Sequence, residues 1–160
     1  MGAAVGEVVG GFGVRVATFN IHHGTVGSAG PVDVERLAEV CAGFDADVLG
    51  LQEVDLLTER TGRRDLPGDV ARALGMAHIF GPSTRYPGGW YGNALLVRGE
   101  IRRRSLDRLH RLPRWKATQE RRTLLRAQVE VDEVVLSVGV THLAVPRPIG
   151  LRQLRHLVDL

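Results

Sequence analysis

The sequence contains few cysteines, few lysines and few aromatic residues. Its single cysteine, Cys41, excludes an internal disulfide framework and a cysteine-rich metal site. Aromatic residues make up 5% of the 160 residues, which argues mildly against the stacking platforms that bind single-stranded nucleic acid. No stretch approaches the roughly 20 apolar residues that span a bilayer, and the N-terminus lacks the basic segment of a secretory signal. We therefore expect a cytoplasmic protein without a membrane span.

The composition is that of one globular domain, with 44% hydrophobic and 24% charged residues. The net charge of +3 is unevenly distributed, because Arg98–Arg126 holds eleven basic residues, including the only lysine, against three acidic ones. Such a segment could face phosphates on nucleic acid, a phospholipid headgroup or a small phosphate ester. We favour a solvated loop, in which Pro113 argues against a continuous helix.

Hydrophobic periodicity and turn residues predict a mixed α/β or α+β fold. We expect residues 1–13 to be a flexible N-terminal extension, and we expect a hairpin turn at Asp132-Glu133. Asp33 is a possible N-cap of the first helix, and in the last helix Leu151, Leu154 and Leu157 or Val158 are the apolar positions. Strands are predicted at 14–21, 47–54, 78–80, 91–97, 123–131 and 134–140, and helices at 32–42, 68–74 and 150–160.

Polar side chains end three of the apolar strands. Asn20 closes the first, Glu53 closes the second, and His142 follows the last. A carboxylate at the end of a buried strand costs free energy to desolvate unless a positive group meets it. That group is either one of the twenty arginines of this sequence or a divalent metal, so the pattern suggests a hydrolytic metal site.

The chemistry of the three residues fits magnesium better than zinc. Mg²⁺ prefers oxygen ligands, keeps several waters and takes one or two protein carboxylates. Glu53 would hold the ion, Asn20 would either ligate it or orient Glu53, and His142 would contact a phosphate oxygen as a neutral donor or a cation. His22 and His23 suggest zinc, but adjacent side chains in an extended chain point apart, and no other His or Cys spacing completes a tetrad.

Four short motifs resemble the endonuclease/exonuclease/phosphatase superfamily in order and spacing. They are Thr18-Phe19-Asn20-Ile21, Leu51-Gln52-Glu53-Val54, Tyr91-Gly92-Asn93-Ala94 and Thr141-His142-Leu143. The resemblance implies a DNase I-like four-layer sandwich of two packed mixed β-sheets flanked by helices. It also implies that Asn20 and Glu53 form half of a magnesium site (Mn²⁺ being the alternative), that His142 contacts the scissile phosphate, and that Asn93 orders the substrate-binding floor. Asp55 and Arg60 are expected to form a structural ion pair.

Two motifs of that superfamily are absent from the sequence. No Gly-Asp is followed by the expected Asn, and no Asp-His pair occurs, although the histidine of that pair is the family's general base. We therefore expect residues 14–160 to be the N-terminal portion of such a domain, incomplete at the C-terminus. The expected function is magnesium-dependent hydrolysis of a phosphodiester or phosphomonoester. The alternatives are a non-catalytic phosphate- or nucleic-acid-binding remnant, or a fragment completed by a partner chain.

Overall fold

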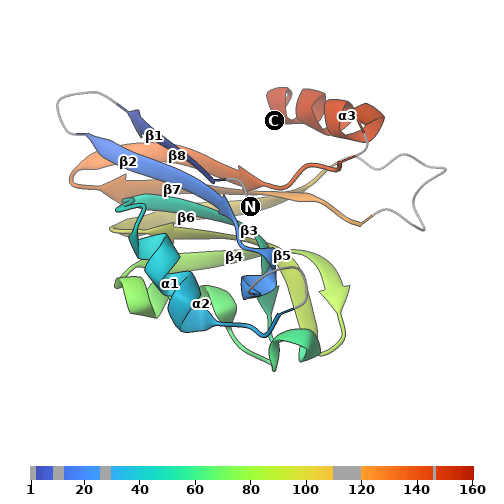
Figure 1. Ribbon diagram of the computed structural model, residues 1–160. Coiled ribbons are helices and arrows are strands. Elements are labelled where there is room, and N and C mark those ends of the chain that lie inside the picture. Colours follow the sequence, from blue (N-terminus) through green and yellow to red (C-terminus); the bar gives the residue numbers. More distant parts are fainter. Residues whose placement is uncertain (1–2, 9–12, 26–29, 110–119, 146) are drawn as a thin grey trace.

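The computed structural model describes residues 3–8, 13–25, 30–109, 120–145 and 147–160 (Figure 1). The described chain forms eight strands and three α-helices. Two 3-10 turns, His22–Gly24 and Glu59–Thr61, lie beside the strand ends that carry the site. In chain order the elements are β1 (Ala3–Val8), β2 (Val14–Asn20), α1 (Val34–Ala42), β3 (Val48–Leu56), α2 (Leu66–Leu74), β4 (Ala77–Tyr86), β5 (Gly89–Val97), β6 (Glu100–Arg108), β7 (Thr123–Val131), β8 (Val134–Thr141) and α3 (Arg147–Val158).

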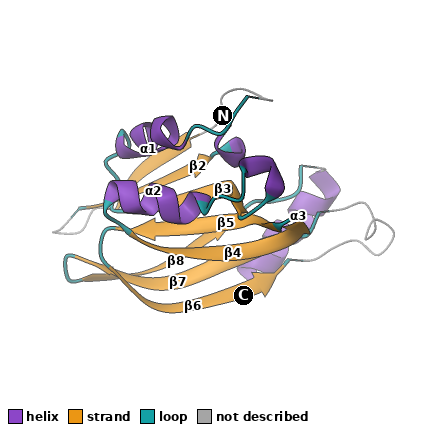
Figure 2. Cartoon of the chain, turned by 90° about the horizontal axis from the view of Figure 1, so that it is seen from below, coloured by secondary structure: helices purple, strands orange, loops and turns teal. Residues whose placement is uncertain are grey.

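Two sheets pack face to face, with helices on both outer sides (Figures 1 and 2). The larger sheet has the order β1-β2-β3-β5-β4 and is mixed, because β2 and β3 run parallel while its other pairs are antiparallel. The described part of the second sheet is β6-β7-β8 and is antiparallel. Helices α1 and α2 cover the larger sheet, and α3 lies on the opposite side of the sandwich (Figure 1). This arrangement confirms the four-layer architecture.

Two apolar clusters hold the layers together. One lies between the larger sheet and α1 and α2 and includes Phe19, Leu51 and Val70. The other lies between the two sheets and includes Val48 and Val140. Because β3 supplies residues to both clusters, its two faces are buried, which explains its nearly unbroken apolar sequence.

The three predicted helices are present, but their first or last residues differ from the predicted ones. The Asp33 side chain accepts a hydrogen bond from the backbone N–H of Arg36 at 2.9 Å, so it is the N-cap of α1 as predicted. Helix α2 begins two residues before the predicted start, because Asp65 caps it by accepting from the N–H of Gly68. The Asp132-Glu133 turn joins β7 and β8, and both of its residues have positive φ.

Three strands differ most from the prediction, while β3 and β5 differ by two residues at one end. Strand β1 occupies Ala3–Val8 and pairs with β2 where a flexible extension was expected; the domain boundary at residue 14 stays a prediction. Strand β4 runs on to Tyr86 because Pro82 lies at a register shift of an edge strand, where proline is tolerated. Strand β6 lies inside the basic segment that we expected to be a loop, and most of its side chains are exposed. Pro113 lies outside the described residues.

Most of the apolar positions predicted for the last helix are wrong. Leu151, Leu154 and Val158 are exposed, Leu157 is partly buried, and the buried residues are Ile149 and Gln153. Gln153 is tolerated there because its side-chain oxygen accepts a hydrogen bond from the N–H of Ala144 at 2.8 Å. Among the described residues, no helix is long and apolar enough to cross a membrane.

Candidate metal and phosphate site

Asn20 is the last residue of β2 and lies beside Glu53 of the neighbouring parallel strand β3. Glu53 was predicted to close that strand, but β3 continues to Leu56, so the carboxylate lies inside the strand, at an irregularity of the sheet. The Nδ2 of Asn20 donates a hydrogen bond to Oε1 of Glu53 at 2.8 Å, and its Oδ1 accepts one from the backbone N–H of His22 at 3.1 Å. Turning the amide over would set oxygen against oxygen at Glu53, so the hydrogen bonds define its orientation. In this geometry Asn20 orients the Glu53 carboxylate, which is one of the two roles considered from the sequence.

Glu53 lies in a bulge that aims its side chain out of the sheet. The register between β3 and β5 shifts between Leu51 and Val54, and Glu53 has a φ of 56°. As a consequence Val54 packs in the same cluster as Leu51, where strict alternation would put Glu53. A left-handed glutamate costs about 1–3 kcal/mol, and such strain concentrates at functional sites.

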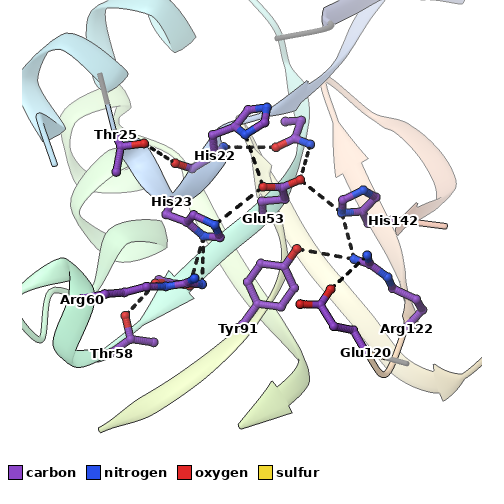
Figure 3. Close-up of polar contacts among 12 residues, drawn as sticks. His22, His23, Thr25, Glu53, Thr58, Arg60, Tyr91, Glu120, Arg122 and His142 are labelled. Atoms are coloured by element: carbon purple, nitrogen blue, oxygen red, sulfur yellow. Dashed lines mark hydrogen bonds and ion pairs between the residues drawn. The ribbon is translucent and has the colours of Figure 1, made fainter. Parts of the chain in front are cut away.

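His22 and His23 both face Glu53, contrary to the prediction that adjacent side chains point apart. The chain is not extended here, because both residues have positive φ, 45° and 61°. The Nδ1 of His22 lies 3.5 Å from Oε2 of Glu53, and the Nε2 of His23 lies 3.8 Å from the same oxygen (Figure 3). Nothing in the sequence pattern shows this double left-handed turn.

Behind His23 lies the predicted ion pair of Asp55 and Arg60. Arg60 Nε and Nη2 donate to the two Asp55 carboxylate oxygens at 2.6 and 2.7 Å, and the hydroxyl of Thr58 donates at 2.6 Å. Burial alone would raise the pKa of Asp55, but the hydrogen bonds from Arg60, His23 and Thr58 lower it to about 2. The Nδ1 of His23 lies 3.0 Å from Arg60 Nη2 and 3.4 Å from Asp55 Oδ1, which fixes the ring beside Glu53.

His142 approaches Glu53 from the second sheet. Its Nδ1 lies 3.9 Å from Glu53 Oε1 and 3.1 Å from Arg122 Nη1 (Figure 3). Burial lowers the pKa of His142, and the Arg122 guanidinium lowers it further. The ring is therefore neutral at pH 7. Because Arg122 can only donate, Nδ1 is the acceptor and the proton is on Nε2.

Arg122 and Tyr91 are site residues that the sequence analysis did not identify. The Arg122 side chain is only 11% exposed; it forms an ion pair with Glu120 at 3.0 Å and lies 3.4 Å from the Tyr91 hydroxyl. Burial raises the pKa of Tyr91 to about 12, so its hydroxyl stays protonated. Eleven basic residues in one segment concealed which arginine is buried.

Asn93 lies beneath the site. It is 2% exposed, and its Nδ2 donates to the backbone oxygen of Thr123 at 3.3 Å. This bond joins β5 to the start of β7, next to Arg122. The position suits the predicted ordering of the floor, and its substrate-binding role stays a prediction.

The surroundings of Glu53 suit a divalent cation. Among the described residues no lysine or arginine lies within ion-pair distance of its carboxylate, whose neighbours are histidine rings and the Asn20 amide. One carboxylate with vacant coordination for water is a normal Mg²⁺ arrangement. No group of three or more His, Cys, Asp or Glu residues is placed to hold a metal ion in the part of the chain that the structure describes.

Two sheets packed between helices, with Asn20 and Glu53 on adjacent strands and His142 opposite, define a DNase I-like protein. The chain belongs to the Endonuclease/Exonuclease/phosphatase family, whose model matches residues 17–159. This superfamily consists of hydrolytic phosphoesterases that generally depend on divalent metals. A comparison with curated proteins found no match.

Solved structures share the fold. An endonuclease/exonuclease/phosphatase from Beutenbergia cavernae DSM 12333 is 26% identical with a TM-score of 0.77, over 91% of this chain and 43% of that chain. A family protein from Leptotrichia buccalis C-1013-b is 14% identical with a TM-score of 0.67, over 91% and 62%. A humanized D. rerio TDP2 with 14 mutations is 20% identical with a TM-score of 0.61, over 91% and 55%. The chain thus spans less than two thirds of each of these proteins.

Proposed function

We propose that this chain carries the metal- and phosphate-binding half of a divalent-metal-dependent phosphoesterase, with Mg²⁺ as the expected ion and Mn²⁺ as the alternative. The observation that carries the proposal is Glu53 itself. It is placed on a strained bulge, oriented by Asn20, and has no arginine or lysine partner in the described chain. A bound cation would compensate its charge and would polarise a phosphoryl oxygen.

The residues around Glu53 have distinct roles in this proposal. Asn20 holds the carboxylate in one orientation. His142, kept neutral by burial and Arg122, donates its Nε2 proton to a phosphate oxygen, and its Nδ1 contact with Arg122 fixes that tautomer. Arg122 adds a positive charge close to where a phosphate would lie.

The general base is not among these residues. Neither Gly-Asp-x-Asn nor Asp-His occurs in the 160 residues, and general-base catalysis is typically worth about 10²–10⁴-fold in rate. We therefore propose that the base belongs to a part of the active enzyme that this sequence does not contain, and that this chain alone hydrolyses esters slowly. The substrate class is a phosphate ester in nucleic acid, in a phospholipid headgroup or in a small molecule.

Paramagnetic relaxation tests the half-site without requiring turnover. With Mn²⁺ and dimethyl phosphate as the probe, we expect the chain to enhance ³¹P relaxation, because ion and phosphate bind side by side. The enhancement should disappear in Glu53→Gln and persist in Glu35→Gln, a matched change on the exposed face of α1. Equal enhancement in Glu53→Gln would contradict the proposal. If dimethyl phosphate binds the chain equally tightly after EDTA has removed the metal ion, the result favours the alternative of a non-catalytic phosphate-binding protein.

A further inference from the structure

The Glu53 carboxylate is surrounded by nitrogen donors. Ring nitrogens of His22, His23 and His142 lie 3.5, 3.8 and 3.9 Å from its oxygens. The side-chain oxygens of Asn20 and Asp55, which could ligate a metal, already accept hydrogen bonds. Asn20 Oδ1 accepts from the His22 N–H, and the Asp55 carboxylate accepts from Arg60 and Thr58. The side chains nearest to an ion at Glu53 would therefore be its own carboxylate and neighbouring imidazoles, of which the His22 ring lies nearest.

His23 and His142 have their Nδ1 atoms occupied. Arg60 lies 3.0 Å from the His23 Nδ1, and Arg122 lies 3.1 Å from the His142 Nδ1. These contacts fix both rings beside the carboxylate and leave little freedom to move toward an ion. His22 differs, because its side chain is 47% exposed and, within the part of the chain that the structure describes, its ring forms an ion pair with Glu53 but no hydrogen bond to an arginine.

The separation of His22 Nδ1 and Glu53 Oε2 suits two ligands of one ion. At 3.5 Å it is longer than a hydrogen bond. Two donors that each lie about 2.1 Å from a shared ion, at angles between octahedral and tetrahedral, are about 3.0–3.4 Å apart. A small movement of the exposed ring reaches that range. The φ of 45° at His22 turns its side chain toward Glu53.

We propose that His22 is a metal ligand beside Glu53, so that the centre binds imidazole-accepting divalent cations such as Co²⁺ or Zn²⁺ more tightly than Mg²⁺. Imidazole suits these ions, whereas Mg²⁺ favours carboxylate and water. The inference rests on the proposed function, because it needs an ion at Glu53. It names one further ligand of that ion.

The test compares two cations in the whole 160-residue chain. Co²⁺ binding is followed by its visible absorption and by calorimetry, and Mg²⁺ binding is followed by calorimetry. The variant is His22→Asn, because asparagine tolerates the left-handed backbone. His78→Asn, on the exposed side of β4, is the matched control.

We expect His22→Asn to raise the Kd for Co²⁺ at least about tenfold and to change the visible spectrum, since even outer-shell partners of a metal are worth that much. The Kd for Mg²⁺ should change less than about twofold, because Mg²⁺ binds oxygen. The inference is overturned if His22→Asn weakens Co²⁺ binding no more than His78→Asn does. It is also overturned if His22→Asn weakens the binding of Co²⁺ and of Mg²⁺ equally. Glu53→Gln should weaken both ions; if it weakens neither, the proposed function fails as well.

Discussion

Gly50 of β3 packs against Val140 of β8, and this contact brings the two sheets together beneath the site. A Cβ added at Gly50 would lie 3.0 Å from Val140 Cγ2. Glu53 lies three residues beyond the glycine, and His142 lies two residues beyond the valine. The spacing between the sheets therefore helps to set how close the carboxylate lies to the imidazole.

Enlarging Gly50 should destabilise the fold through overpacking. We expect Gly50→Val to lower the free energy of unfolding by about 1–3 kcal/mol. Urea denaturation measures the loss. Adding Val140→Ala to the same chain should restore part of it, because the two side chains share one space; losses that simply add would show that this contact is not tight.

Removing Arg60 should leave the buried Asp55 carboxylate without its arginine partner. Breaking a buried ion pair from one side costs about 3–5 kcal/mol, and the partial exposure of Arg60, 34%, places Arg60→Ala at the lower end. Chemical denaturation of Arg60→Ala beside Arg63→Ala gives the comparison. Arg63 forms an exposed pair with Glu59, so its loss should cost less than about 1 kcal/mol; equal costs would refute the structural role of the buried pair.

Acid should weaken the fold through Asp55. Its pKa is lowered from 3.8 to about 2, so its stabilising contribution is complete above pH 4 and is lost as pH falls through 2. This corresponds to about 2 kcal/mol. Unfolding free energies measured between pH 5 and pH 2 should fall more steeply for the natural chain than for Asp55→Asn. Parallel curves would contradict the assignment.

Arg122 should control the protonation of His142. Burial and the neighbouring guanidinium both lower the pKa of the imidazole, so Arg122→Gln removes one cause and should raise that pKa, leaving it below the ordinary value. Nitrogen chemical shifts of the ring, followed in an NMR titration, measure it. Arg121→Gln, with an exposed side chain, should leave the pKa unchanged; an equal rise in that variant would mean that net charge alone is responsible.

The fold and the positions of Asn20 and His142 were predicted from the sequence because each has a local signal. The apolar runs before these two residues predict strand ends, and Asp33 predicts a helix start. The run before Glu53 predicts the strand but not its end, since β3 continues to Leu56. The architecture then followed from the family motifs, and the family match confirms it. The ion pair of Asp55 and Arg60 was also predicted, because the two residues are close in sequence.

The features that the sequence did not show depend on local backbone geometry and on which side chains the tertiary fold buries. The bulge at Glu53 and the left-handed turn at His22 and His23 carry no composition signal, because glycine is absent from these positions. Arg122 is distinguished from its neighbours only by burial against Tyr91 and His142. Strand β6 was missed because an exposed edge strand can be rich in arginine and still pair along one side.

The most direct test of the account is a crystal structure of the chain grown with MnCl₂, with anomalous diffraction recorded at the manganese edge. We predict an anomalous peak within about 2.5 Å of a Glu53 carboxylate oxygen, and no peak there in Glu53→Gln crystals grown in the same way. The claim that this carboxylate holds the metal of a phosphoesterase site would be contradicted if the natural chain showed no manganese peak at Glu53. It would also be contradicted if the peak were unchanged in Glu53→Gln.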